Sequence, residues 1–211
     1  MSYCCLTFTT NQIRRVTLPF FLSLIITTNF YGQENLVQNG SFEEYHTCPE
    51  GEAYFEGDQL IGCKYWKMPG SGTSDYFNSC HAPSNEVGVP DNFAGWQVPF
   101  QGNAYAGIII YADPEGNQLT VSEYIQTKLI RALESCEKYQ VRFWVNLSNC
   151  SARASNTIGL RFDSVPIVTI ETTNESIIKL PDHINTTEIF TDTSDWHLIT
   201  GVYEALAEKN I

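Results

Sequence analysis

Alternation of apolar and polar residues is the dominant pattern in this chain, and it is clearest across residues 137–148. The apolar positions of this stretch are Tyr139, Val141, Phe143, Val145 and Leu147. The intervening positions are polar, with Trp144 as the exception. A period of two residues is typical of a strand with one buried and one exposed face, so this stretch is predicted to be a strand.

Shorter stretches of the same kind predict further strands at 105–111, 123–130, 157–162, 165–170 and 196–203. Segments rich in Gly, Pro, Asn and Asp separate them, and long amphipathic helical patterns are nearly absent. Because helical crossovers are missing, neighbouring strands are expected to run antiparallel. The pattern therefore predicts an all-β sandwich.

Residues 65–100 do not follow this pattern. They are rich in aromatic and small polar residues and show little periodicity. An irregular run of this length within a compact domain is usually functional or held in place by cross-links. We therefore expect a long aromatic loop here, within a β-sandwich that spans residues 33–211.

The first 32 residues have the composition of a secretory signal peptide. They contain no Asp or Glu, and Arg14 and Arg15 precede an apolar run of 11 residues at 16–26. The small residue Gly32 marks the expected cleavage point. A membrane-spanning helix needs about 20 apolar residues, so a short N-terminal anchor is the less favoured alternative. We expect an exported protein that does not insert into a membrane after cleavage.

The charge balance narrows the choice of partners. The chain contains 24 acidic and 12 basic residues, which give a formal net charge of −12 at pH 7. Such a chain repels phosphate backbones and anionic lipid surfaces, so nucleic acid is not expected as a partner. Cations and neutral ligands such as glycans fit this charge better.

Five cysteines lie outside the predicted leader: Cys48, Cys63, Cys80, Cys136 and Cys150. In an exported chain cysteines are first interpreted as disulfides, and an odd number leaves at least one thiol outside them. His46 and His81 stand beside Cys48 and Cys80, so a Cys–His metal site is an alternative to a Cys48–Cys80 disulfide. Export and the unusual ligand spacing favour the disulfide. The last two cysteines flank the strand at 137–148, too far apart to pair with each other.

Four aromatic residues of the long loop are candidates for contact with a glycan: Trp66, Tyr76, Phe93 and Trp96. An aromatic ring offers an apolar platform for the C–H face of a sugar ring, and neighbouring Asn or Asp side chains can bind its hydroxyls. The alternative is that these rings pack the core and the loop, which is the commoner role of aromatics in such domains.

Signatures of catalysis are missing from the sequence. It contains no GxSxG, HExxH, phosphate-binding loop or dinucleotide fingerprint. Carboxylates are plentiful, so a carbohydrate-active enzyme is kept as a second alternative. We nevertheless expect a protein without enzymatic activity, because no pairing of a nucleophile with a base can be placed.

Three stretches, taken in order, resemble a known kind of module. They are "NLVQNGSFEE" at 35–44, "DYFNSC" with "VGVPDNFAGWQ" within 75–97, and "NAYAGIIIY" at 103–111. Together they resemble the N-terminal jelly-roll module of exported surface proteins of gliding bacteria, which an outer membrane protein A-type peptidoglycan-binding domain often follows. The resemblance covers about residues 34–207. The closing strand and the second domain of that family have no counterpart here, so the chain resembles a truncated copy whose sheet keeps an unpaired edge.

This resemblance implies a galactose-binding-like, antiparallel jelly-roll sandwich at the cell surface or outer membrane, linked to gliding motility. It implies a binding or structural module, with an architectural spacer of a cell-envelope protein as the alternative. Glu43 would be a ligand of a structural calcium ion, although the strand that carries the partner Asp is missing. Ser164, within "DSV" at 163–165, resembles the acceptor of the short O-glycosylation signal of such bacteria.

Overall fold

The computed structural model describes residues 2–7, 14–15, 34–50, 59–69, 73–83, 86–111, 122–168 and 182–206. These residues form an antiparallel, nearly all-β structure, as predicted. The strands are β1 (Ser2–Thr7), β2 (Arg14–Arg15), β3 (Trp66–Lys67), β4 (Asp75–Asn78), β5 (Asp91–Asn92), β6 (Gly95–Trp96), β7 (Ala104–Tyr111), β8 (Gln126–Thr127), β9 (Lys138–Leu147), β10 (Gly159–Leu160), β11 (Ile184–Asn185) and β12 (His197–Glu204). One 3₁₀ turn, η1, spans Gln59–Gly62. No helix long and apolar enough to cross a membrane occurs among these residues.

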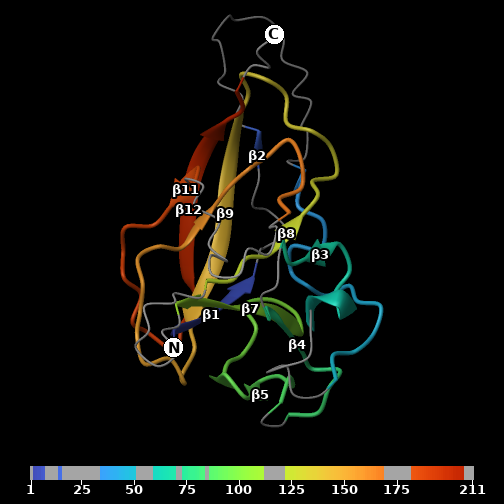
Figure 1. Ribbon diagram of the computed structural model, residues 1–211, viewed down its shortest axis with the longest axis vertical. Coiled ribbons are helices and arrows are strands. Elements are labelled where there is room, and N and C mark those ends of the chain that lie inside the picture. The colour runs from blue at the N-terminus through green and yellow to red at the C-terminus, as the bar shows by residue number, and fades with distance from the viewer. Residues whose placement is uncertain are drawn as a thin grey trace, which may run out of the picture.

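One large sheet organises the molecule. Its strand order is β12-β9-β1-β7-β4, and β2 also pairs with β9 (Figure 1). β12 pairs with β9 along its whole length, from His197 opposite Val145 to Glu204 opposite Lys138. The apolar positions of β9 up to Val145 are at most 2 % exposed, which confirms the strand predicted from the alternation at 137–148.

The second layer consists of short pieces rather than a continuous sheet. It contains the two-stranded pairs β3–β8 and β10–β11 and two isolated bridges, Val37 with Leu129 and Tyr45 with Cys63. The strands predicted at 123–130 and 157–162 therefore shrink to two residues each. The described part of the stretch predicted at 165–170, residues 165–168, is not a strand.

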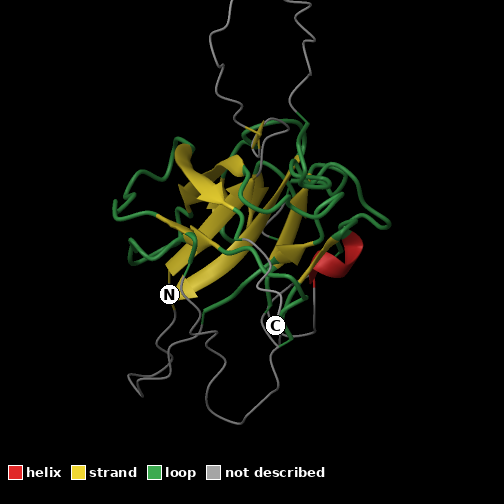
Figure 2. Ribbon diagram, turned by 90° about the horizontal axis from the view of Figure 1, so that it is seen from above, coloured by secondary structure: helices red, strands yellow, loops and turns green. Residues whose placement is uncertain are grey.

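A main hydrophobic core lies between the sheet and these short pieces. It comprises Leu36, Val37, Phe42, Leu60, Cys63, Trp66, Tyr76, Ala104, Ala106, Ile108, Tyr139, Val141, Phe143, Val145, Ile158, Ile184, Ile199 and Ala205. Seen from above, the strands gather in the middle of the molecule, loops surround them and η1 lies at the rim (Figure 2). Burial of this apolar surface is the main force that holds the two layers together.

The prediction of one irregular loop at 65–100 is wrong, because the described part of this segment contains four strands and one of them, β4, belongs to the main sheet. β4 is buried along its whole length, so its residues contact apolar groups on both faces and show no alternation. A second cluster, formed by Phe77, Val87, Val89, Ala94 and Tyr105, lies on the face opposite the main core. Residues 86–97, here called the cover segment, supply much of this cluster.

The N-terminal segment contributes to the sheet itself. β1 lies between β7 and β9 and pairs antiparallel with both strands. This position gives no support to the signal peptide predicted at residues 1–32, whose cleavage after Gly32 stays a prediction. The apolar run at 16–26 lies outside the described residues.

Candidate ligand-binding surface

Hydrogen bonds of Asn39 hold the turn at Asn39 and Gly40 against the residues around β3. Asn39 has a φ of 47°, and its side-chain amide donates to the carbonyls of Glu44 and Lys64. Its backbone carbonyl accepts a hydrogen bond of 2.9 Å from the indole nitrogen of Trp66. Asn tolerates the left-handed conformation and supplies both donor and acceptor, so this residue fixes the turn on β3.

Glu43, the predicted calcium ligand, makes hydrogen bonds within the protein. Its Oε1 accepts from the backbone N–H of Asn103 at 2.7 Å, and its Oε2 accepts from the side-chain amide of Asn103 at 3.1 Å. Gly102 beside it has a φ of +69°, and a Cβ there would collide with the Glu43 carboxylate. The described residues contain no group of three or more His, Cys, Asp or Glu side chains that could hold a metal ion. Calcium binding at Glu43 stays a prediction, which melting with and without a chelator would test.

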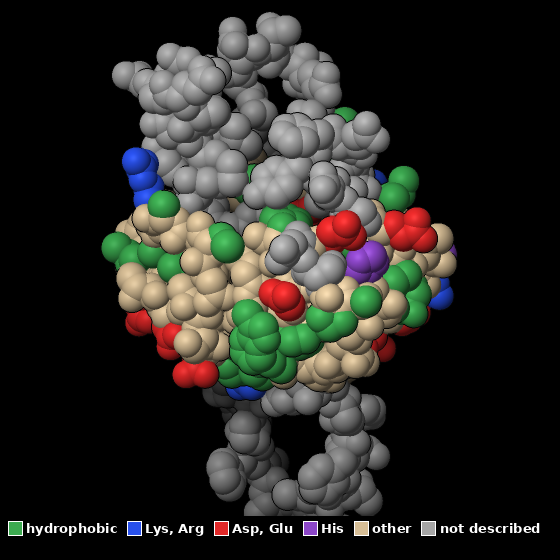
Figure 3. All heavy atoms as spheres, turned by 90° about the horizontal axis from the view of Figure 1, so that it is seen from below, with side chains coloured by type: hydrophobic (Ala, Val, Ile, Leu, Met, Phe, Trp, Pro, Cys, Tyr) green, Lys and Arg blue, Asp and Glu red, His purple; other side chains and the backbone are tan. Residues whose placement is uncertain are grey.

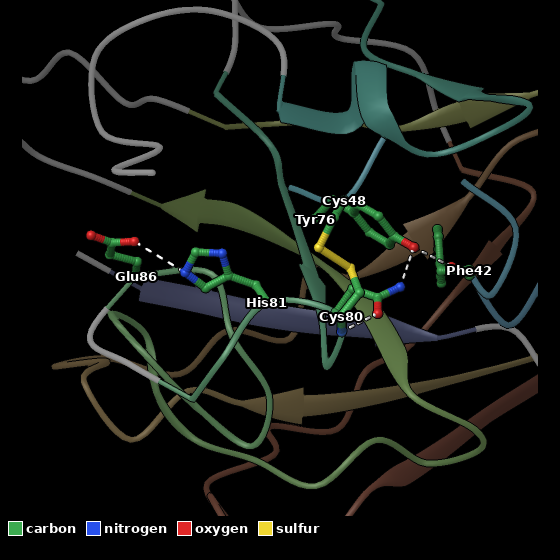
Figure 4. Close-up of a disulfide and its surroundings, with 7 residues drawn as sticks. Phe42, Cys48, Tyr76, Cys80, His81 and Glu86 are labelled. Atoms are coloured by element: carbon green, nitrogen blue, oxygen red, sulfur yellow. Dashed lines mark hydrogen bonds and ion pairs between the residues drawn. A yellow bond between two sulfur atoms is a disulfide. The ribbon is translucent and has the colours of Figure 1, made fainter. Parts of the chain in front are cut away.

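Cys48 and Cys80 form the predicted disulfide, with their Cα atoms 6.0 Å apart (Figure 4). The bond joins the segment after the Asn39 turn to the residues that follow β4. The imidazole of His81 points away from the sulfur atoms, and its Nε2 lies 3.2 Å from Glu86 Oε2. A Cys–His metal site at these two cysteines is therefore excluded, because both thiols are consumed by the bond.

The other three cysteines outside the leader, Cys63, Cys136 and Cys150, are free thiols. The prediction that the last two do not pair with each other is confirmed. Cys63 is buried, and this burial raises the pKa of its thiol to about 12. A thiol that stays protonated is a poor nucleophile and a poor metal ligand, so this cysteine acts as a core residue.

The four candidate aromatics differ in how far they are exposed to solvent. Trp66 is 6 % exposed and packs on Phe42, with ring centroids 4.9 Å apart. Tyr76 is fully buried: its hydroxyl donates to the carbonyl of Phe42 at 2.7 Å and accepts from the Asn78 amide at 2.6 Å (Figure 4). Burial raises the pKa of this phenol above its usual range. These two rings are occupied by the core and have no face available for a sugar.

The remaining two candidates lie in or beside the cover segment. Phe93 is half-buried against Phe77, at a centroid distance of 5.4 Å. Trp96 is 59 % exposed, and its backbone N–H donates to Asn149 Oδ1 at 2.8 Å. Trp96 is therefore the candidate whose ring remains accessible to a ligand.

Trp96 belongs to a surface that sequence reasoning found only in part. Residues 98–100 continue from it, and Val98 is 49 % exposed while Phe100 stacks on Trp144 at a centroid distance of 4.0 Å. The carbonyl of Val98 accepts from the indole of Trp196 at 2.8 Å. We call Trp96, Val98, Phe100, Trp144 and Asn149 the Trp96 surface. Trp144 could have been found, because it is the apolar exception on the polar face of β9.

Both apolar and acidic side chains lie at the end of the molecule where β5 is found. Seen from below, hydrophobic side chains gather in one strip, and acidic side chains lie beside it (Figure 3). The Trp96 surface combines an aromatic platform with the exposed amide of Asn149, whose Oδ1 accepts from the backbone N–H of Trp96. Such a surface can bind by stacking and hydrogen bonding.

One buried carboxylate away from this surface, that of Glu123, serves the fold. Glu123 is 4 % exposed, and one of its oxygens accepts from the backbone and side chain of Thr73 at 2.6 and 2.8 Å. Its other oxygen accepts from the backbone N–H of Ile109 at 2.8 Å. These bonds connect the start of β4 to β7, so the carboxylate is satisfied by structural donors.

Ser164, the candidate glycosylation acceptor, lies at an exposed bend. Its backbone N–H donates to Asp163 Oδ1 at 2.9 Å. Asp163 pairs with Arg161 at 3.1 Å, and the hydrogen bond from this guanidinium lowers the pKa of the carboxyl. The hydroxyl is accessible at this position, and its modification stays a prediction.

Comparisons with protein families, with curated proteins and with solved structures found no match to this chain.

Proposed function

We propose that the chain is an exported module of the cell surface that recognises a glycan through the Trp96 surface, without carrying out chemistry. The observation that carries this proposal is the ring of Trp96, which at 59 % exposure is the most exposed aromatic side chain among the described residues. A large exposed aromatic next to a hydrogen-bonding side chain is the usual composition of a carbohydrate-binding platform.

The backbone of this platform is well anchored. The backbone N–H of Trp96 donates to Asn149 Oδ1, and the backbone N–H of the next residue, Gln97, donates to the carbonyl of Pro90 at 2.7 Å. A backbone that is held in place loses little further conformational freedom on binding, which favours affinity. The acidic net charge of the chain agrees with a neutral ligand rather than an anionic one.

The finer fold assignment belongs to the same proposal. A main sheet of antiparallel strands faces an irregular second layer across the main core, which supports a jelly-roll sandwich of the galactose-binding type. Location at the outer membrane or outside the cell, and a link to gliding motility, follow from the resemblance. Fractionation of the producing cells with an antibody against the protein would test the location.

The test of glycan binding is a comparison of two variants on a glycan array, followed by titration of any hit. Trp96→Ala removes the platform and should reduce affinity at least tenfold, whereas Trp96→Phe should retain part of it. Because the ring is exposed, Trp96→Ala should change the free energy of unfolding by only about 0.5 kcal/mol. Ile61→Ala is a matched control, since Ile61 is 77 % exposed and belongs to η1.

A wild-type protein that binds no glycan on the array would contradict the proposal. The second candidate, an architectural spacer, would then be favoured. One observation already supports that candidate: Trp66 and Tyr76, two of the four predicted contact residues, are core residues. Enzymatic activity on a polysaccharide panel, abolished by one carboxylate substitution, would overturn both candidates.

A further inference from the structure

One carboxylate lies beside the ring of Trp96. Asp91 of β5 is exposed and is the residue opposite Trp96 of β6 in their antiparallel ladder. Asn92, the next residue of β5, is 4 % exposed, and its amide donates to the Tyr105 hydroxyl in the interior. Successive side chains of a strand point to opposite faces, and residues opposite each other share a face. Asp91 therefore points away from the interior, on the side where Trp96 is exposed.

The hydrogen bonds of this hairpin bring the two side chains close together. The backbone N–H of Trp96 donates to Asn149 Oδ1 at 2.8 Å, so it does not point toward Asp91. One position further along the ladder, the backbone N–H of Gln97 donates to the carbonyl of Pro90 at 2.7 Å. Asp91 and Trp96 thus form a pair without mutual backbone hydrogen bonds. The side chains of such pairs are the closer ones, with Cβ atoms about 4.5–5.5 Å apart.

The carboxylate of Asp91 is available to a ligand. Its side chain makes no hydrogen bond or ion pair with another residue that the structure describes. The buried carboxylate of Glu123, by contrast, accepts hydrogen bonds from structural donors. The amide of Asn149 is already engaged at both ends, because Oδ1 accepts from Trp96 and Nδ2 donates to the Thr193 carbonyl at 3.4 Å. Asp91 therefore keeps its full hydrogen-bonding capacity for a ligand on the ring.

A carboxylate next to an aromatic ring selects a ligand by three properties. The ring requires an apolar face, such as the C–H face of a pyranose. The carboxylate only accepts hydrogen bonds, so it requires donors at the edge of that face, which sugar hydroxyls supply. Hydrogen bonds to a charged acceptor are about twice as strong as those between neutral groups. The same charge repels a second anion, so acidic sugars fit this surface poorly.

We propose that Asp91 determines the specificity of the Trp96 surface: its carboxylate accepts hydroxyl hydrogens of an uncharged sugar whose C–H face lies on the Trp96 ring, and it rejects acidic sugars. This inference rests on the proposed glycan binding and names the class of sugar. Asn149 is a positioning residue for the same site, since it holds the backbone N–H of Trp96.

The first experiment titrates the full chain with a neutral oligosaccharide that binds on the glycan array. Asp91→Ala should weaken binding about tenfold, because it removes a charged acceptor. Asp91→Asn retains an acceptor without the charge, so its loss should be smaller, about threefold. Glu204→Gln is the matched control, since this exposed carboxylate lies at the end of β12, opposite Lys138, and should leave the affinity unchanged. Equal affinities of the wild type and Asp91→Ala would overturn the proposal.

The second experiment compares two ligands that differ in one group: the neutral oligosaccharide and the same oligosaccharide with a uronic acid in place of one hexose. The wild type should bind the acidic ligand several-fold more weakly, and both Asp91 variants should reduce this difference. A merely structural role of Asp91 would lower both affinities and leave their ratio unchanged, which would overturn the proposal. Binding restricted to sugars with a free ammonium group would overturn it as well, because the carboxylate would then act as a counter-ion.

Folding and the proposed function are checked separately. Because Asp91 is exposed, the melting midpoints of both variants should stay within about 3 °C of the wild type. If Asp91→Ala does not fold, Asp91→Asn alone decides through the ratio of the two affinities. A wild type that binds no glycan would overturn the proposed function and this inference together. Glycan binding that is unchanged in the Asp91 variants would overturn this inference alone.

Discussion

The two hydrophobic clusters on opposite faces of β4 and β7 are built in different ways. Tyr76 and Ala106 face the main core, while their sequence neighbours Phe77 and Tyr105 face the second cluster. The main core draws on side chains from Leu36 to Ala205, so it depends on the fold of nearly the whole described chain. The second cluster consists of buried residues that all lie within 77–105. The partly buried Phe93, Ile109 and Trp196 pack against it.

This difference indicates that the cover segment is an accessory layer. It buries one end of the sheet with few apolar side chains, and it holds the Trp96 surface at its edge. Regions with few buried apolar contacts open at a lower free energy than the core does. The cover segment should therefore loosen separately from the sheet, and the following predictions test this comparison.

The largest effect is expected from a cavity in the main core. Phe143 is 2 % exposed, and Phe143→Ala should lower the free energy of unfolding by about 3–5 kcal/mol in denaturant titration. Phe93→Ala removes the same number of atoms from a half-buried ring of the cover segment and should cost less. Its main effect should be faster amide exchange in residues 86–97. Equal losses of global stability in the two variants would contradict the distinction between core and cover.

The disulfide should have the next largest effect. It closes a loop of 32 residues, so replacing Cys48 and Cys80 by Ala should cost about 2–4 kcal/mol of stability. The bond links the segment after the Asn39 turn to the end of β4, and its loss should loosen the attachment of β4 to the main core. Cys136→Ala is the matched control, because this thiol is free and exposed. A double variant as stable as the control would show that the bond does not stabilise the fold.

Two tyrosine hydroxyls allow a finer comparison of the clusters. Tyr76→Phe removes the donor to the Phe42 carbonyl and the acceptor of the Asn78 amide, and should cost about 1–3 kcal/mol. Tyr105→Phe removes the acceptor of the Asn92 amide, which also donates to the Gly88 carbonyl at 3.1 Å and so keeps a partner. The second change should therefore cost less. Thermal melts of both variants measure the order, and the reverse order would contradict it.

The smallest effect is a pH dependence at the rim of the main core. Nδ1 of His183 accepts from the backbone N–H of Phe162 at 3.0 Å, and the imidazole stacks on Tyr203 at a centroid distance of 4.7 Å. Burial and, secondarily, the Arg161 charge lower the pKa of His183 below its ordinary value of 6.5. The unfolded chain then binds the proton more readily than the folded one. The contribution of His183 to the free energy of unfolding is therefore complete above pH 6.5, and it is lost as the pH falls through the lower pKa of the folded state.

Melting midpoints at pH 8, 7, 6 and 5 measure this contribution. His183→Phe keeps a stacking ring but cannot bind a proton, so the variant should lose less stability than the wild type between pH 7 and pH 5. The difference between the two chains is the informative quantity, because contributions that both chains share cancel in it. Parallel curves for the two chains would show that His183 does not contribute.

The elements that sequence reasoning predicted correctly are those with a local signature. β9 and β12 alternate because one face is buried and the other less so, whereas β7 is apolar along most of its length and is buried on both faces from Ala104 to Ile108. β3, β5, β6, β8, β10 and β11 are two residues long, which is too short to show any period. β4 is buried on both faces, so it has no alternation, and the segment around it was wrongly predicted to be an irregular loop. The Cys48–Cys80 bond was predicted from the expected export of the chain and from a Cys–His spacing that is unusual for a zinc site.

The candidate site was predictable only as a group of residues. Trp66, Tyr76, Phe93 and Trp96 are alike in sequence terms, since all are aromatic and belong to one aperiodic segment. Their exposed fractions differ because Trp66 and Tyr76 face the main core and Phe93 packs in the cover, while Trp96 lies at the edge of the cover. Phe100 and Asn149 are far apart in sequence, and only the stacking on Trp144 and the hydrogen bond to Trp96 bring them to the same surface.

The sequence by itself predicted the antiparallel β class, the long strands β7, β9 and β12 and, with a metal site as the alternative, the pairing of Cys48 with Cys80. These depend on side-chain periodicity and covalent chemistry, which are properties of short stretches or of few residues. The tertiary structure decided that Glu43 binds the Gly102–Asn103 turn, that Trp96 is accessible and that β1 occupies the middle of the main sheet. These depend on which distant segments pack together, because burial and strand pairing are contacts between parts of the chain and not properties of either part alone.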